Sequence, residues 1–173
     1  HISVERSGEQ GLVLRAVHRT LAPYWLYCEP PEDVLFTENE TNHQVLFGSE
    51  NQTRYVKDGI NDCVVYGRRN TVNPERNGTK AAAHYTITVP AGDKTEIRLR
   101  LTHIAPQALK EEPFGSHFNT VLKARQSEAD EFYQSITPAS ASADAASVLR
   151  QALSGMLWSK QYYFFDADRW LEE

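Results

Sequence analysis

The spacing of apolar residues changes once along the chain, and this change limits the folds that the sequence can adopt. Before about His103, short runs rich in β-branched and aromatic residues predict β-strands. After Pro113 the apolar residues recur at intervals of three and four, which predicts amphipathic helices. Strands without helices between them form antiparallel sheets, because parallel strands need long crossover connections. We therefore expect a β-rich region, an antiparallel sheet or partial β-sandwich, followed by two C-terminal helices.

The strand pattern is clearest near the end of the β-rich region. There Ile97, Leu99 and Leu101 alternate with polar residues, so we expect these three side chains to face a core. Pro90–Asp93 has the composition of a turn and predicts a hairpin between the last two strands. The expected strands are Leu12–His18, Tyr24–Cys28, Cys63–Tyr66, Ala82–Val89 and Thr95–Thr102.

Two helices are expected in the C-terminal part. The first begins near Ser116, a residue type that caps helices, and the second runs from about Asp144 to Tyr163. A run of Ser, Ala and Pro at 137–143 predicts a flexible connection between them. Residues 158–165 are aromatic on all sides, which requires burial on all sides. Two helices cannot supply that burial, so we expect further helices in a longer parent chain.

Length and charge narrow the classes of partner. The 173 residues carry a formal net charge of −5, with no basic stripe, which argues against nucleic acid. No apolar run reaches the ~20 residues that would cross a membrane. The chain opens at His1 rather than Met and ends without a closing element, so we interpret it as a fragment or a processed piece. The sequence leaves the cellular compartment open.

The two cysteines, Cys28 and Cys63, both fall in apolar runs that we expect to be strands. Neither has a partner at zinc-ligand spacing, so we expect two buried thiols. A disulfide between them remains an alternative in an oxidising compartment. Three Asn-x-Thr sequons would suit a secreted protein, but motifs this short arise by chance and decide nothing.

No catalytic constellation stands out in the sequence. It lacks Gly-x-Ser-x-Gly, a phosphate-binding glycine loop and His-Glu-x-x-His, and its six His are scattered. Glu38 and Glu40 stand two residues apart, but the sequence cannot give the carboxylate separation that glycoside hydrolysis requires. We therefore assign no catalytic residue, no metal site and no cofactor.

Two polar loops and a set of aromatic residues suggest carbohydrate as the ligand. Residues 35–42 and 57–62 carry acids, carboxamides and bases, so they form either a self-satisfied loop or part of a site. Trp and Tyr offer flat faces for sugar rings, and polar side chains fix hydroxyl groups; Trp25, however, we expect in the core. The candidate substrate-binding residues are Glu38, Asn39, Lys57, Asp58, Trp158, Lys160, Gln161 and Tyr162.

Several motifs resemble the bacterial glucosidase-like proteins of glycoside hydrolase family 63, relatives of the mannosyl-oligosaccharide glucosidases. They are Leu-Phe-Thr-Glu-Asn-Glu-Thr-Asn at 35–42, Lys-Asp-Gly at 57–59, Val-Asn-Pro at 72–74, Gly-Thr-Lys-Ala-Ala-Ala at 78–83 and Gly-Met-Leu-Trp-Ser-Lys-Gln-Tyr-Tyr at 155–163. The resemblance implies an N-terminal β-sandwich followed by an (α/α)6 barrel. It makes residues 1–105 the later half of the sandwich, 106–143 a linker with one helix, and 144–173 the first barrel helix.

The resemblance also implies the division of labour in the parent enzyme. Its catalytic acid and base would lie on the barrel, and no position here matches those motifs. The parent would be an inverting α-glycosidase, and this segment would be its non-catalytic part. Its partners would be an oligosaccharide and the rest of the parent chain, and the cytoplasm would be the favoured compartment of such a bacterial parent. Independently of the resemblance, we expect Lys160 to pair with an acid of the polar loops, because a Lys buried among aromatic residues needs a partner. The alternative is an autonomous β-sandwich module that binds carbohydrate or another protein.

Overall fold

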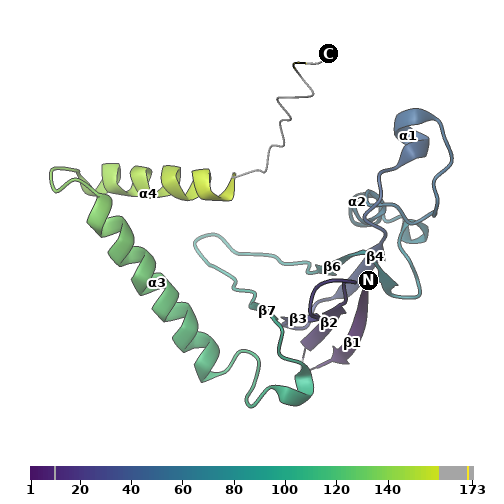
Figure 1. The fold of residues 1–173 in the computed structure, drawn as a ribbon, viewed down its shortest axis with the longest axis horizontal. Coiled ribbons are helices and arrows are strands. Elements are labelled where there is room, and N and C mark those ends of the chain that lie inside the picture. Colours follow the sequence, from purple (N-terminus) through teal and green to yellow (C-terminus); the bar gives the residue numbers. More distant parts are fainter. Residues whose placement is uncertain (10, 160–170, 172–173) are drawn as a thin grey trace. The chain divides into compact units, whose positions relative to one another are not determined.

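We describe residues 1–9, 11–159 and 171 in a computed structural model of the protein. The chain divides into two compact units, His1–Ser116 and 117–173 (Figure 1). The first unit holds all seven strands and the second holds the two long helices among the described residues. Antiparallel β-structure followed by C-terminal helices is therefore confirmed. The boundaries expected from the resemblance, after 105 and after 143, stay predictions.

A five-stranded antiparallel sheet is the larger of two sheets in the first unit. Its strand order is β5-β1-β2-β3-β7. The strands β2 and β3 match the expected ones, and β7 is shorter than expected because only its second half pairs with β3. The bounds are β1 Ile2–Gly8, β2 Gly11–Ala16, β3 Tyr24–Cys28, β5 Asn77–Gly78 and β7 Leu99–Thr102.

A two-stranded antiparallel sheet, formed by β4 (Asp33–Thr37) and β6 (Lys80–His84), packs on the larger one. Its strand β4 is buried on both faces. Val34 and Phe36 contact Leu12, Leu14 and Cys28 of the large sheet in the main core. The intervening Leu35 faces α2 (Gly59–Tyr66), where it contacts Cys63. The small sheet therefore lies between the large sheet and a helix.

The other face of the large sheet has a different cover. Val13, Trp25 and Tyr27 form a second cluster there, beneath Ala105, Leu109 and Phe114 of the segment that follows β7. The buried hydroxyl of Tyr27 donates to the carbonyl of Ile104 at 2.9 Å. This segment contains the short helix η2 (Pro106–Ala108). The expectation that Trp25 belongs to the core is confirmed.

The expected strand Cys63–Tyr66 is wrong, because these residues form the end of helix α2. A short apolar run fits either a strand or a helix, and only its neighbours decide between them. Gly67 ends the helix in the left-handed region at φ 66°, and its N–H donates to the carbonyl of Asp62. Cys63 is buried while Tyr66 is exposed, which is the pattern of a helix packed on one side.

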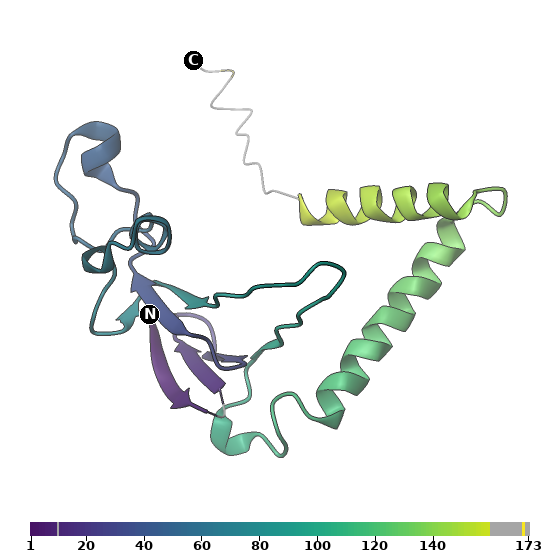
Figure 2. The same ribbon diagram turned by 180° about the vertical axis from the view of Figure 1, so that it is seen from behind.

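The expected hairpin is also wrong. A turn does form at Pro90–Asp93, with the N–H of Asp93 3.1 Å from the carbonyl oxygen of Pro90. The strands on either side of the turn do not pair with each other, however, because β6 pairs with β4 and β7 pairs with β3. Residues 85–98 therefore form an extended arm that connects β6 of the small sheet to β7 of the large sheet (Figure 2).

Ile97, Leu99 and Leu101, which we expected to face a core, are not buried. Their exposed fractions are 39%, 51% and 66%, whereas Arg100 is half-buried. The alternation itself is present, and Arg100 faces the covered side, where it donates to the carbonyl of Pro113 at 3.1 Å. The apolar side of β7 simply lacks a cover.

The second unit consists of α3 (Ser116–Ile136) and α4 (Ala143–Trp158). Both helices were expected, and Ser142 caps α4 by accepting a hydrogen bond from the N–H of Ala145 at 3.2 Å. Neither helix has a buried residue, so their apolar stripes are not covered within the part of the chain that the structure describes. No helix of the described residues is long and apolar enough to cross a membrane.

Candidate functional site

The two polar loops predicted from the sequence lie side by side in the first unit. The loop after β4 and the segment before α2 are joined by main-chain hydrogen bonds. The N–H of Glu38 donates to the carbonyl of Tyr55 at 2.8 Å, and the N–H of Lys57 donates to that of Glu40 at 3.0 Å. The arrangement follows from β4, whose buried end at Thr37 delivers the chain directly into the first loop. We call residues 38–42, 55–58 and 79–80 the polar cluster.

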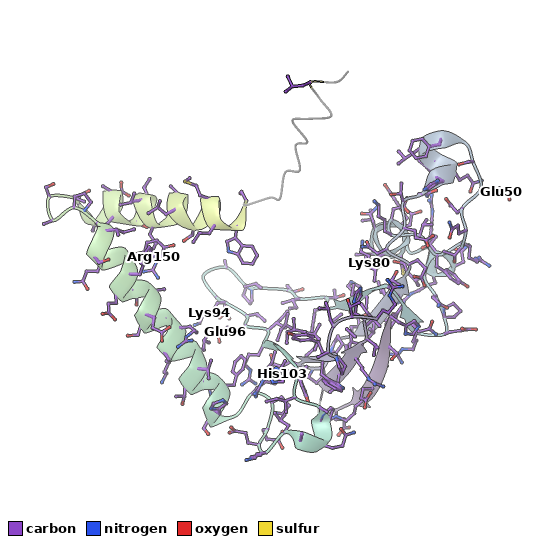
Figure 3. All side chains as sticks on the ribbon, in the orientation of Figure 1. Glu50, Lys80, Lys94, Glu96, His103 and Arg150 are labelled. Carbon is purple, nitrogen blue, oxygen red and sulfur yellow. The ribbon has the colours of Figure 1, made fainter. Side chains whose placement is uncertain are left out.

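Side-chain bonds connect the three segments of the polar cluster. Lys57 donates from Nζ to Oγ1 of Thr41 at 3.1 Å, and Lys80 donates from Nζ to the carbonyl of Lys57 at 3.0 Å (Figure 3 labels Lys80). Thr79 donates from Oγ1 to Oε2 of Glu38 at 2.5 Å and accepts from the N–H of Asn39 at 2.7 Å. The cluster therefore presents ammonium, hydroxyl and carboxylate groups in fixed positions.

Asn42 organises the loop that leaves the polar cluster. Its Nδ2 donates to Oδ2 of Asp58 at 2.9 Å, and its Oδ1 accepts from Nδ2 of Asn51 at 3.0 Å. The same oxygen accepts from the N–H of Val45 at 3.2 Å and caps the short helix α1 (His43–Phe47). The polar groups of this loop therefore bond largely to one another, as expected for a self-satisfied loop.

Two glycines permit the close approach of segments beside the polar cluster. A Cβ atom on Gly59, at the start of α2, would lie 2.2 Å from the carbonyl oxygen of Thr71. A Cβ atom on Gly78 would lie 2.4 Å from that of Thr37. Any larger residue would have to displace backbone atoms, so both positions require glycine.

Two hollows lie beside these loops. The larger has a volume of about 310 Å³, at the lower end of the roughly 300–1,000 Å³ typical of small-molecule sites. The smaller has a volume of about 180 Å³. The larger is lined by Glu40, Thr41, His43, Glu50 and Gln52. The smaller is lined by Asn42, Gln44, Asn51, Arg54, Val56, Asp58, Gly59, Asp62 and Thr71.

The chemistry of these surfaces is that of hydrogen bonding to a polar ligand. Carboxylates and carboxamides accept hydrogen bonds from hydroxyl groups, while Lys and Arg donate to ligand oxygens. Among the described residues there is no group of three or more His, Cys, Asp and Glu that could hold a metal ion. Glu38 and Asp58 each already accept a hydrogen bond from a neighbouring side chain. The arrangement can therefore both donate hydrogen bonds to a polar ligand and accept hydrogen bonds from it.

Two acids near the ends of β3 and β4 are held ionised by arginines. Hydrogen bonds from the backbone N–H and the guanidinium of Arg98 lower the pKa of Glu29. Burial raises the pKa of Asp33, but hydrogen bonds from Arg69 and from the N–H of Val34 outweigh it, so the net shift is downward. These pairs fasten β7 and η1 (Arg69–Thr71) to the sheets.

The two cysteines are confirmed as buried free thiols. Burial raises the pKa of the Cys28 thiol to about 11. Cys63 packs against Leu35 and Val72 under α2. Both thiols therefore act as small apolar side chains in the core, and Cys28 is protonated at neutral pH.

The structure brings together only part of the predicted substrate-binding set. Glu38, Asn39, Lys57 and Asp58 lie in the polar cluster, and Asp58 also lines the smaller hollow. Trp158 ends α4 in the second unit, with 91% of its surface exposed. Lys160, Gln161 and Tyr162 lie outside the described residues, and so does the expected pairing of Lys160 with a loop acid. The roles of all these residues in binding stay predictions.

The predicted substrate-binding set omits several residues that connect the polar cluster. Asn42, Thr79 and Lys80 make most of its side-chain bonds, and all three belong to motifs noted in the sequence. The position of Thr79 and Lys80 directly after Gly78 could have indicated these two, because glycine marks a close backbone approach. Which loop that segment meets depends on the pairing of β6 with β4.

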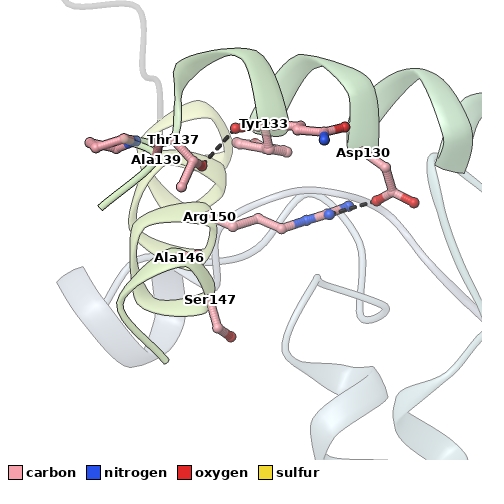
Figure 4. A pocket seen from close by; sticks show the side chains of 9 residues that line it. Asp130, Tyr133, Thr137, Ala139, Ala146, Ser147 and Arg150 are labelled. Carbon is pink, nitrogen blue, oxygen red and sulfur yellow. Dashed lines mark hydrogen bonds and ion pairs between the residues drawn. The ribbon is translucent and has the colours of Figure 1, made fainter. Parts of the chain in front are cut away.

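A further hollow, of about 690 Å³, lies in the second unit between α3 and α4 (Figure 4). Arg150 of α4 points at Asp130 of α3, with 2.6 Å between their nitrogen and oxygen atoms, and its guanidinium stacks over the ring of Tyr133. The hydroxyls of Tyr133 and Ser154 are 2.8 Å apart. These contacts hold the two helices together at their connection.

Comparison with known proteins identifies a curated relative in yeast. The chain is 38% identical over 144 residues to the uncharacterized protein YMR196W of Saccharomyces cerevisiae. The match covers 79% of this chain but 13% of the yeast protein, so the chain spans only a small part of its relative's length. No family model matches the chain, and no solved structure matches it.

Proposed function

We propose that residues 1–173 form the non-catalytic sandwich-and-linker part of a glycoside hydrolase that acts on α-glucosides or related oligosaccharides. The two packed sheets would belong to the β-sandwich, and the second unit would lead into an (α/α)6 barrel that carries the catalytic carboxylates. The observation that carries the proposal is the convergence of the two polar loops, which agrees with the motifs that resemble glycoside hydrolase family 63. The long yeast relative is compatible with a larger parent.

In this proposal the polar cluster forms part of the rim of the sugar site. Lys57 and Asp58 would contact substrate hydroxyls, since one donates and the other accepts hydrogen bonds. Both are held by neighbours, Thr41 and Asn42, which fixes their direction before a sugar binds. An inverting mechanism needs a protonated and an ionised carboxyl on opposite sides of the bond, and the proposal places both outside residues 1–173.

The test is steady-state hydrolysis of a panel of α-linked glucosides by the full-length natural protein. Asp58→Asn should raise KM several-fold with little change in kcat, because a rim contact holds substrate and transition state alike. Asp93→Asn, an exposed acid in the arm, is the matched control and should change neither constant. Residues 1–173 alone should be inactive. Hydrolysis by this segment that disappears in Glu38→Gln would contradict the proposal.

A second function, binding of another protein, is favoured by one observation. The short helix α1 projects three apolar side chains, Val45, Leu46 and Phe47, which are 63–74% exposed. Its base is braced by the contacts of Asn42 with Asn51 and Asp58. A full-length protein that hydrolyses no glucoside, yet loses a protein partner on Phe47→Ser, would favour the interaction module.

A further inference from the structure

The uncovered face of β7 continues the main core of the first unit. Leu12, Cys28 and Leu99 lie opposite one another across β2, β3 and β7. In the same way Leu14, Leu26 and Leu101 form a second row. Directly paired residues in antiparallel strands point to the same face of a sheet. Leu99 and Leu101 therefore lie on the face that carries the core.

The cover of this face ends before it reaches β7. Val34 and Phe36 of β4, with Ala81 and Ala83 of β6, cover the parts contributed by β1, β2 and β3. Leu12, Leu14 and Cys28 are consequently buried, while Leu99 and Leu101 are more than half exposed. The large sheet has five strands and the small sheet has two, so one layer is narrower than the other.

The small sheet has one edge at which a strand can be added. The outer edge of β4 is occupied where the N–H of Asn73 donates to the carbonyl of Phe36 at 2.8 Å. The outer edge of β6 has no strand partner in the described chain, because the small sheet contains only β4 and β6. The end of β6 lies near β7, since Tyr85 after β6 donates to the carbonyl of Glu29, and the N–H of Glu29 donates to the carbonyl of Arg98 before β7. An unpaired edge beside an uncovered apolar face is a template for strand addition.

A second copy of this chain does not fit the size of the face. The exposed apolar surface here comes from only three partly exposed side chains, Ile97, Leu99 and Leu101, and patches of a few hundred Å² are ordinary on a monomer. A stable interface buries about 800 Å² on each partner. The face is therefore more suited to a single strand continuing an existing core than to a dimer.

We infer that a further β-strand of the same polypeptide, from outside residues 1–173, pairs with the outer edge of β6 and covers Leu99 and Leu101. Its side chains are apolar at every second position, because only one of its faces meets the large sheet. The yeast relative, of which the matched part is a small fraction, has ample sequence to supply such a strand. The inference does not depend on the proposed activity.

Hydroxyl-radical footprinting of the unsubstituted full-length natural protein tests whether the face is covered. Leu21, in the connection between β2 and β3, is the matched control because its 64% exposure is close to the 66% of Leu101. We expect Leu101 to be oxidised about tenfold more slowly than Leu21, as for a side chain reached only by local opening. Equal rates for the two leucines would overturn the inference.

Cross-linking identifies what covers the face. A photoactivatable maleimide is attached to Leu101→Cys in the full-length protein, with Leu21→Cys as the control and with the native thiols buried. The expected product joins Cys at 101 to a peptide of the same molecule that lies outside residues 1–173 and alternates apolar with polar residues.

Three outcomes of this experiment overturn the inference. One is a cross-link between molecules in a mixture of isotope-labelled and unlabelled protein, which would indicate a second copy. Another is a cross-link to residues 117–173, and the third is a peptide with helical periodicity. Because neither measurement uses hydrolysis, the inference can fail or hold independently of the proposed function.

Discussion

Strands β4 and β7 show that the alternation of apolar and polar residues in a sequence says little about burial. β4 reads Asp-Val-Leu-Phe-Thr, without alternation, and is buried on both faces between the large sheet and α2. β7 reads Leu-Arg-Leu-Thr, with strict alternation, and its apolar face is open. Alternation determines which side chains share a face. Whether that face is covered depends on how wide the opposing layer is.

Truncation of one side chain in each strand should give the largest contrast in stability. Phe36→Ala in β4 should lower the free energy of unfolding by about 3–5 kcal/mol, because it opens a cavity in the main core. Leu99→Ala in β7 should lower it by less than about 1 kcal/mol in residues 1–173, since half of that side chain is already exposed. Urea unfolding followed by tryptophan fluorescence measures both. Equal losses of stability from the two substitutions in residues 1–173 would contradict the difference in burial between β4 and β7.

A substitution at Gly59 tests the cover on the outer face of β4. Gly59→Ala places a Cβ atom against the carbonyl of Thr71 and should destabilise by about 1–3 kcal/mol, because backbone atoms must shift. Gly8→Ala, where no atom lies within 4 Å of the added Cβ, should change stability by less than about 0.5 kcal/mol. Thermal unfolding of the two variants measures the difference. A tolerated Gly59→Ala would show that α2 is not fixed against β4.

The loop that leaves β4 can be tested through Asn42. Asn42→Ala removes the cap of α1 and the bonds to Asn51 and Asp58, and should destabilise the loop by about 1–2 kcal/mol. Faster amide hydrogen exchange in residues 43–51 is the measurement. Asn39→Ala is the matched control, because the loop bond of Asn39 is made by its backbone N–H. Identical exchange in both variants would contradict the role given to Asn42.

The smallest expected effect concerns the anchor of β7. Glu29 accepts from Nε of Arg98 at 2.7 Å and from its N–H at 2.8 Å, which lowers the pKa of the carboxyl. Glu29→Gln should therefore destabilise by about 0.5–1 kcal/mol at pH 7, a value reduced because Arg98 is partly exposed to solvent.

The same pair predicts a pH dependence. A lowered pKa means that the contribution of Glu29 is present above the pKa of about 4 in the unfolded chain and is lost as the pH falls through the folded value. Urea unfolding at pH 7 and near pH 3 should therefore show the variant and the natural chain converging in acid. A difference that stays constant with pH would show that charge is not its origin.

The sequence predicted best where local pattern and tertiary surroundings agree. β2 and β3 carry apolar residues on both faces and are covered on both, and α3 begins at the expected Ser116. It failed at Cys63–Tyr66, because four apolar residues fit a strand or a helix equally well. It also failed at the hairpin, because a turn at Pro90 fixes a reversal of the chain and leaves the pairing of its flanks open.

For the candidate site, the sequence indicated the two loops but not their connections. The acids and carboxamides of 38–42 and 57–58 are visible as a polar run between apolar segments. Thr79 and Lys80 join them only because β6 pairs with β4 and brings the Gly-Thr-Lys segment beside Glu38. Contacts between segments about 40 residues apart are a property of strand pairing.

The sequence by itself determined the antiparallel β-structure, the two C-terminal helices, and which residues of β7 share a face. These features depend on side-chain periodicity and caps, which are local. Only the tertiary structure decided that β4 is buried on both sides, that Leu99 and Leu101 are uncovered, and that the polar loops meet. The physical reason is that burial and pairing depend on which distant segment supplies the opposing surface. The side-chain periodicity of one segment carries no information about the segment that packs against it.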